Sequence, residues 1–331
     1  MEVRTLGRTG LKVSVLGFGC GAVGGLMVKG TPADQERAVA WAIDQGINYF
    51  DTAAQYGDGQ SETNLGRVLR ALKMPRETTL VGTKLRVFPA DRGRVGAAII
   101  EAMDASLRRL GMDSVDLFQL HNAITNAGAE PELSVQMVLN EVVPALEKLR
   151  QQGKTRFFGI TALGDSSALH RIVAAGVMDT AQIPHNLLNP SPMHELPPGY
   201  PAQDFLQLMP AAQAAGIGII GIRVLAGGAL SGSEARHPIG MQSVEPIGSS
   251  ASYAVDAANA RRLEPLVREG HAASVIEAAI RFAISNDAMS TVLVGLSTQA
   301  ELEVAVAAIN KGRLSDAALA RTVQLQAGFK S

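Results

Sequence analysis

The stretch TPADQERAVAWAIDQGINYFDT, residues 31–52, contains one complete helix-to-strand unit and sets the pattern for the rest of the chain. Thr31 and Pro32 are a typical N-cap and first helical residue, and apolar residues recur at helical spacing as far as Gly46. The run Ile47 to Thr52 follows at once and predicts a short strand. A helix joined directly to a short buried strand is typical of a parallel sheet covered by helices.

The same unit recurs to the end of the chain. A first strand is expected to end near Phe18, and later helices and strands follow as pairs: 62–72 with 79–84, 93–110 with 115–121, 134–152 with 155–161, 166–175 with 180–184, 205–215 with 218–222, 274–285 with 290–295, and a last helix from Thr298. Eight units without a linker or a shift in composition favour one α/β domain over residues 1–331, a single (β/α)8 TIM barrel. Two short β-prone stretches at 3–6 and 11–15, joined by a glycine-bounded turn, predict an N-terminal β-hairpin within residues 1–15.

Three loops depart from this rhythm. The proline-rich segment 186–204 and the Gly- and Ser-rich segment 227–255 both follow predicted strands, on the face where barrels build active sites, so we expect both over the active site. The sequence GCGAVG, residues 19–24, matches the dinucleotide fingerprint, but no helix is expected to start inside it. We therefore predict a glycine-rich loop there, where a ligand approaches the backbone closely at Gly21.

Composition excludes several classes of protein. Of 331 residues, 47% are hydrophobic and 18% charged, which excludes a disordered chain. A formal net charge of −1 without like-charge runs argues against nucleic-acid and membrane partners. One cysteine permits no intrachain disulfide, and the histidines lack metal-ligand spacing, so we expect no metal and a cytoplasmic location. The uncharged run 13–28 contains five glycines and is too short to span a membrane as a helix.

Four polar residues follow or end neighbouring predicted strands: Asp51, Tyr56, Lys84 and His121. Considered one at a time, each of the four has an ordinary structural explanation: a helix cap, a loop residue, a strand-edge charge and a core histidine. Together they form a coherent site, because a buried lysine needs a carboxylate such as Asp51, and a nearby cation favours the phenolate form of a phenol, whose pKa is otherwise about 10. A histidine that donates a hydrogen bond can polarise a carbonyl. The set suits carbonyl reduction and lacks the nucleophile, paired carboxylates or metal ligands of a hydrolase or lyase.

These residues lie in motifs that resemble the aldo-keto reductase superfamily: FDTAAQYG (50–57), TK (83–84), QLHN (119–122), GIT (159–161), QIPHNLL (182–188) and GALSG (228–232). The resemblance runs from the hairpin to the last helix. It implies a barrel whose lower end is closed by the hairpin, with an extended nicotinamide cofactor across the upper end. It also implies that Tyr56 is the general acid/base, that Lys84 and Asp51 favour its ionisation, and that His121 orients the carbonyl.

The resemblance also implies a set of cofactor contacts. Gln182 matches the glutamine that binds the nicotinamide carboxamide, Thr52 lies with Asp51 near the nicotinamide ribose, and Thr161 keeps the hydroxyl of a Ser-Asn pair but is followed by Ala162. Ile222 or Arg223 replaces an aromatic residue that stacks on the nicotinamide. The backbone of residues 225–232 would line the pyrophosphate, and the capping-box sequence after the last strand would hold the adenosine end. The expected residues are Leu225, Gly227, Gly228, Leu230 and Gly232 for the first group, and Gly295, Ser297, Thr298 and Glu301 for the second.

Coenzyme choice depends on this last loop. Ser297 stands where the family commonly has an Arg or Lys for the 2′-phosphate of NADP. We expect NADP(H) as the cofactor, because it is the more frequent cofactor in the family, with NAD(H) as the alternative. The predicted activity is an NAD(P)-dependent oxidoreductase acting on a small aldehyde or ketone, or the corresponding alcohol or sugar, as a monomer or homo-oligomer. The alternative is a regulatory or redox-sensing subunit on the same barrel, and the complete set of four residues favours the enzyme.

Overall fold

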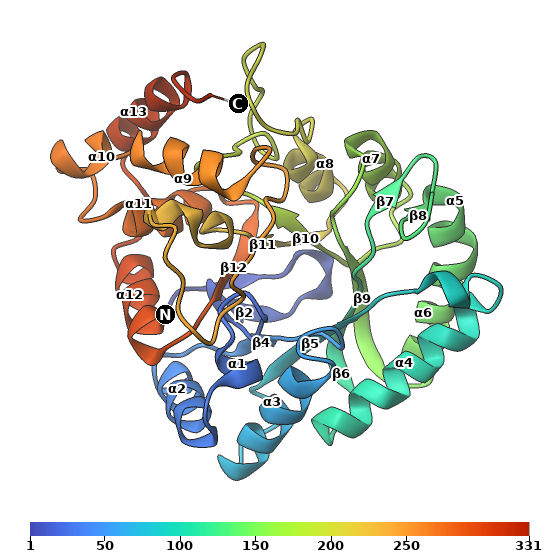
Figure 1. Ribbon diagram of the computed structural model, residues 1–331. Helices are drawn as coiled ribbons and strands as arrows, with labels where there is room; N and C mark the ends of the chain where they lie inside the picture. Colours follow the sequence, from blue (N-terminus) through green and yellow to red (C-terminus); the bar gives the residue numbers. More distant parts are fainter. Residues whose placement is uncertain (331) are drawn as a thin grey trace.

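Eight parallel strands close into a barrel ringed by helices in the computed structural model, which describes residues 1–330 (Figure 1). The strands follow one another around the barrel in chain order, and β12 pairs with β3 to close it, with Val292 opposite Leu16. The strands are β3 (Leu16–Gly19), β4 (Tyr49–Asp51), β5 (Leu80–Leu85), β6 (Val115–Leu120), β9 (Thr155–Thr161), β10 (Thr180–Pro184), β11 (Gly218–Ile222) and β12 (Met289–Gly295). The predicted (β/α)8 barrel is confirmed, and each predicted strand is present.

The predicted hairpin is also confirmed. β1 (Val3–Thr5) and β2 (Lys12–Ser14) pair in antiparallel fashion across a 3-10 turn at Gly7–Thr9. Its apolar side chains Leu6, Leu11 and Val13 join a cluster inside the barrel with residues of five barrel strands. This cluster fills the interior of the barrel at the hairpin end, so a ligand can enter the barrel from the opposite end, where the strands terminate.

Helices lie outside the barrel, and several carry the capping signals read from the sequence. α2 (Pro32–Asp44) begins after Thr31, whose side chain accepts a hydrogen bond from the Asp34 N–H, as expected. The other outer helices are α3 (Gln60–Ala71), α4 (Val95–Leu110), α5 (Val135–Met137), α6 (Val143–Gln151), α7 (Ser166–Ala174), α8 (Leu208–Ala214), α11 (Val275–Ile284) and α12 (Gln299–Asn310). The helix expected at 134–152 contains a π-helical turn at Val138–Val142, just before Pro144, which lacks the N–H that a regular α-helix would use there.

Several elements were not predicted. The glycine-rich loop contains one helical turn, α1 (Leu26–Lys29), and the segment 227–255 begins inside a 3-10 helix at Ala226–Ser231 and ends in α9 (Tyr253–Arg261). Beyond these lie α10 (Pro265–Arg268), α13 (Asp316–Gln326) and a small pair of strands, β7 (Ile124–Thr125) and β8 (Leu133–Ser134). α9 was missed because its alanine-rich sequence has little helical periodicity. α13 does have a sequence signal, since Ser315 caps it by accepting from the Ala318 N–H.

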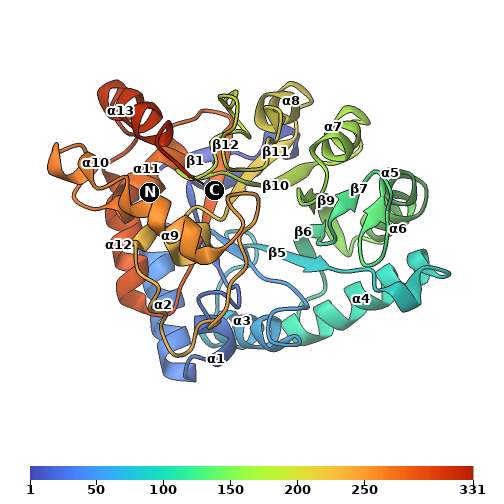
Figure 2. The same cartoon turned by 45° about the horizontal axis from the view of Figure 1, so that its top comes forward.

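One long segment crosses the open end of the barrel. Residues 232–252, here called the strap, connect the 3-10 helix Ala226–Ser231 to α9 and pass close to the β3–α1 loop (Figure 2). The Met241 N–H donates to the Val23 carbonyl at 3.2 Å, and a Cβ at Gly25, whose φ is 89°, would collide with the Ile239 carbonyl oxygen. The strap and the glycine-rich loop therefore enclose a space between them. In the described part of the chain, no helix is both long and apolar enough to cross a membrane.

Candidate active site

The strand ends bring the four predicted catalytic residues together. Asp51 ends β4, Lys84 lies near the end of β5, and His121 comes directly after β6. These strands are neighbours in the barrel, with Asp51 opposite Gly82 and Lys84 opposite Gln119. Tyr56 lies in the turn between β4 and α3. Adjacent parallel strands thus place all four side chains at one end of the barrel.

Asp51 and Lys84 form a buried ion pair. Their side chains are almost wholly buried, and Lys84 Nζ lies 2.5 Å from Asp51 Oδ1 and donates to the Thr52 carbonyl at 2.6 Å. The second carboxylate oxygen, Oδ2, accepts from Tyr49 Oη at 2.8 Å and from Gln182 Nε2 at 2.7 Å. Burial, the largest single effect, lowers the pKa of Lys84, but the charges and hydrogen bonds of Asp51 and Tyr56 together outweigh it and raise that pKa above its ordinary value. Lys84 is therefore a permanent cation at neutral pH.

Tyr56 and His121 stand beside this pair. Lys84 Nζ lies 4.8 Å from the centroid of the Tyr56 ring, and the rings of Tyr56 and His121 are nearly perpendicular, with centroids 5.9 Å apart. Burial, together with the charges of Lys84 and Arg86, holds the pKa of His121 well below its usual range. A neutral imidazole carries one N–H and one acceptor nitrogen, so His121 can donate a hydrogen bond to a carbonyl oxygen without giving up a full proton.

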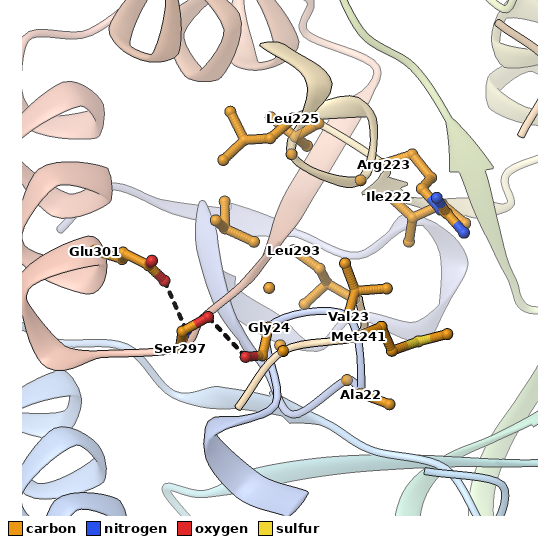
Figure 3. Close-up of a pocket in the computed structure, with 18 of the residues that line it drawn as sticks. Ala22, Val23, Gly24, Ile222, Arg223, Leu225, Met241, Leu293, Ser297 and Glu301 are labelled. Carbon is orange, nitrogen blue, oxygen red and sulfur yellow. Dashed lines mark hydrogen bonds between the residues drawn. The ribbon is translucent and has the colours of Figure 1, made fainter. Parts of the chain in front are cut away.

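A cavity of about 800 Å³ runs from these residues to the loop after β12. Tyr56 and His121 line one end of it, and Ser297 and Glu301 line the other. Figure 3 shows Ser297 and Glu301 on one side of the cavity and Arg223 and Met241 on the other, with Leu293 between them. The wall is formed by the glycine-rich loop, the β11 loop and the strap, so the cavity is long and covered along part of its length.

Most residues expected to bind the cofactor line this cavity: Gly21, Thr161, Gln182, Arg223, Leu225, Gly227, Gly228, Gly295, Ser297 and Glu301. The other four expected residues are not part of the cavity lining, and their cofactor contacts stay predictions: Thr52, Leu230, Gly232 and Thr298. Thr52 is fully buried with its hydroxyl 2.8 Å from Ser61 Oγ, and Leu230 packs in a core cluster with residues of α9 and α11. Gly232 ends a 3-10 helix, and the Thr298 hydroxyl caps α12.

The cavity wall fits an extended nucleotide. A Cβ at Gly21 would lie 3.8 Å from the Tyr56 ring, and one at Gly295 would lie 3.5 Å from the Gly24 nitrogen, so a Cβ at either position would make ordinary van der Waals contacts at the cavity wall. Gly227 and Gly228 have φ values of 68° and 106°, a backbone conformation that favours glycine. Their turn lies beside Arg236, which donates to the Gly227 carbonyl at 2.8 Å. Glycine turns and a cation suit a pyrophosphate.

The adenosine end differs from an ordinary phosphate site. The Ser297 N–H donates to Glu301 Oε2 at 2.6 Å, and Ser297 Oγ donates to the Gly24 carbonyl at 2.7 Å (Figure 3). The Glu301 carboxylate thus stands at the N-terminus of α12, where an anionic ligand would otherwise bind. No Lys or Arg occurs between residues 282 and 310. This end of the cavity offers a carboxylate and backbone groups, and no cation from α12.

Sequence reasoning missed two kinds of functional residue. Tyr49 supports Asp51, and the alternation of a strand could have found it, because residues two apart face the same side. Gln182, which the sequence does single out, lines the cavity, and its second partner could not be read from the sequence: its amide donates to Asp51 while its Oε1 accepts from Thr161 Oγ1 at 3.3 Å. Strap residues such as Arg236 and Met241 had no readable signal, since their place in the wall depends on how the strap folds.

Comparison with known proteins assigns the family. The Aldo/keto reductase family pattern matches residues 15–327. L-galactose dehydrogenase of Arabidopsis thaliana is 32% identical over 316 residues, which cover 94% of this chain and 89% of that protein. A putative voltage-gated potassium channel subunit beta of Schizosaccharomyces pombe is 35% identical over 165 residues, 47% of this chain and 44% of the relative. The chain belongs to the aldo/keto reductase family, and it is an oxidoreductase of a family that uses nicotinamide cofactors.

Solved structures agree on the fold. The holo form of an aldo-keto reductase from Bacillus halodurans superimposes with a TM-score of 0.73 at 24% identity, covering 98% of this chain and 96% of that one. Its apo form gives a TM-score of 0.70. The barrel described above is therefore the same fold.

Proposed function

We propose that this chain interconverts a small polar aldehyde or ketone and the corresponding alcohol, with Tyr56 as general acid/base and NAD(H) as the preferred cofactor. The observation that carries the proposal is the contact of Asp51, Lys84, Tyr56 and His121 at one end of the cavity. The nicotinamide supplies or accepts the hydride when it is bound. Every other requirement of the reaction falls to this chain.

The proton moves at Tyr56 Oη. In reduction, the phenol gives its proton to the carbonyl oxygen as negative charge develops there, and Lys84 stabilises the phenolate that remains. In oxidation, the phenolate takes the proton of the alcohol. His121, which is neutral, holds the oxygen by a hydrogen bond, and Asp51 keeps Lys84 charged and in place.

Two observations support NAD(H) over NADP(H), which reverses the order expected from the family. Glu301 would repel a 2′-phosphate, whereas its free acceptor capacity suits the 2′-hydroxyl of the ribose. An Escherichia coli relative, 28% identical over 215 residues that cover 60% of this chain and 63% of that protein, is named an NADH-specific methylglyoxal reductase. The name of the Arabidopsis relative supports sugars among the polar substrates.

The test is a steady-state assay of the purified protein with NADH and NADPH, using a panel of aldehydes, ketones and sugars in both directions. We expect a higher kcat/KM with NADH than with NADPH for every substrate that reacts. A consistent preference for NADPH would overturn the cofactor assignment, and no turnover with either nucleotide would overturn the enzyme assignment. The cytoplasmic location and the oligomeric state, monomer or homo-oligomer, stay predictions.

A further inference from the structure

Two arginines line the catalytic end of the cavity without a carboxylate partner. Arg86 follows β5 and Arg223 follows β11, so they approach the cavity from different sides of the barrel. Many arginines of this chain pair with acidic side chains, as Arg76 and Arg156 do with Asp116. Within residues 1–330, neither Arg86 nor Arg223 has an Asp or Glu oxygen within 4 Å. Both cations are therefore available to a ligand in the cavity.

Arg223 is held in an environment that disfavours a lone charge. Its side chain is half-buried, and the one hydrogen bond that this side chain donates to the described chain goes from Nη1 to the Glu245 carbonyl at 3.1 Å. Burial lowers the pKa of this guanidinium. Its φ is 57°, a left-handed value uncommon outside glycine that the surrounding structure must impose. A half-buried guanidinium with most of its five donors unused is stabilised when an anion binds.

Both cations act on the reacting residues. The Arg86 charge contributes to the low pKa of His121, and the charges of Arg223 and Tyr56 interact. Of the acidic groups nearby, Asp51 is paired with Lys84, and burial raises the pKa of Asp256, whose carboxylate accepts a hydrogen bond from Ser249 Oγ at 2.6 Å. The place where the carbonyl must lie is thus flanked by net positive charge.

We propose that Arg86 and Arg223 bind an anionic group of the substrate, so that the substrate is an aldehyde or ketone carrying a carboxylate or a phosphate, or the corresponding alcohol. Guanidinium groups recognise both anions through paired hydrogen bonds. Arg236 lies beside the Gly227–Gly228 turn, where the cofactor pyrophosphate is expected, and can bind it. Arg86 and Arg223 are then free to bind the substrate. This inference rests on the proposed function, because it assigns the substrate of the same site.

The experiment compares charged and neutral substrates of matched shape with NADH. The pairs are 4-oxobutanoate with its methyl ester, and glyceraldehyde 3-phosphate with glyceraldehyde, so that the two arms separate a carboxylate from a phosphate. We expect kcat/KM to favour the anion about tenfold in at least one pair, as charge-assisted hydrogen bonds imply. Arg86→Gln and Arg223→Gln should each reduce this preference about threefold, while Arg223→Lys should keep part of what Arg223 contributes. Arg108→Gln, an exposed arginine of α4, is the matched control and should leave the preference unchanged.

Two outcomes would overturn the inference, and a third would overturn the proposed function on which it rests. Equal kcat/KM within both pairs would overturn it. An unchanged preference in Arg223→Gln together with a raised KM for NADH would assign Arg223 to the cofactor pyrophosphate and overturn it as well. No turnover of any of the four compounds, or of the wider panel, with either nucleotide would instead overturn the proposed function. If Arg223→Gln does not fold, the exposed Arg86→Gln still tests the preference.

Discussion

The two ends of the cavity are built in different ways. At the catalytic end, the ion pair and His121 belong to the ends of three adjacent strands, and Asp51 Oδ1 meets Lys84 Nζ within the barrel wall. At the adenosine end, contacts join segments far apart in the chain: Ser297 with Gly24, and Met241 with Val23. Rigid strands fix the chemistry through side-chain identity, whereas packed loops fix the nucleotide site largely through the backbone. Substitutions at the catalytic end should therefore reduce catalysis without changing nucleotide binding, and substitutions at the adenosine end should do the reverse.

Tyr56 should give the largest difference between the effect of a substitution on catalysis and its effect on cofactor binding. Tyr56→Phe removes the proton donor and keeps the ring, so kcat should fall by about a thousandfold, within the usual range for a lost general acid. NADH affinity, measured by fluorescence titration, should change little, because the nucleotide end lies elsewhere in the cavity. Retention of most of kcat would remove Tyr56 from the acid role. A large loss of NADH affinity would show that the two ends are not independent.

Lys84→Met should affect stability as well as activity. The substitution leaves the Asp51 carboxylate buried without its cation, which typically costs about 3–5 kcal/mol in the free energy of unfolding. Urea unfolding measures this loss, and activity should fall with it because the phenolate is no longer stabilised. The double variant Asp51→Asn with Lys84→Met should lose less stability than Lys84→Met alone. Equal losses in the two variants would contradict a coupled pair.

At the other end, Glu301→Gln should change cofactor choice and leave the chemistry in place. Removing the carboxylate charge should raise kcat/KM for NADPH roughly fivefold, since Glu301 is exposed and its electrostatic effect is screened by solvent. Glu303→Gln, two residues along the same helix and also exposed, is the matched control. An equal effect of both substitutions would mean that the helix charge as a whole matters, and that the Glu301 position does not.

The smallest expected effect is that of Tyr49→Phe, at the catalytic end of the cavity. Tyr49→Phe removes one of the hydrogen bonds to Asp51 Oδ2, so the carboxylate keeps more negative charge and compensates Lys84 more fully. The phenolate of Tyr56 is then less favoured, and the corresponding limb of the pH–rate profile should move to higher pH by a few tenths of a unit. Tyr200→Phe, which removes a hydroxyl bonded to the Leu188 carbonyl, is the control. A profile identical to wild type would exclude this positioning role.

Some expectations were met because the sequence signal and the local physics coincide. The helix cap at Thr31 and the hairpin of residues 1–15 depend on neighbours in the sequence, and both are present. Gln182 and Thr52 show the opposite case. The motif predicts that both lie near the site, but the partners of their side chains, Asp51 for Gln182 and Ser61 for Thr52, come from other strands and helices and cannot be read from neighbours in the sequence.

The sequence by itself determined the barrel and the four chemical groups, because helical and strand periodicity repeats locally and rare polar residues at strand ends converge in any such barrel. Only the tertiary structure decided where the strap runs, that it lies against the loop at Val23, and that Arg86 and Arg223 lack carboxylate partners. These features depend on which distant groups approach within a few ångströms. Contacts of that kind carry no period along the chain, so no local pattern could reveal them.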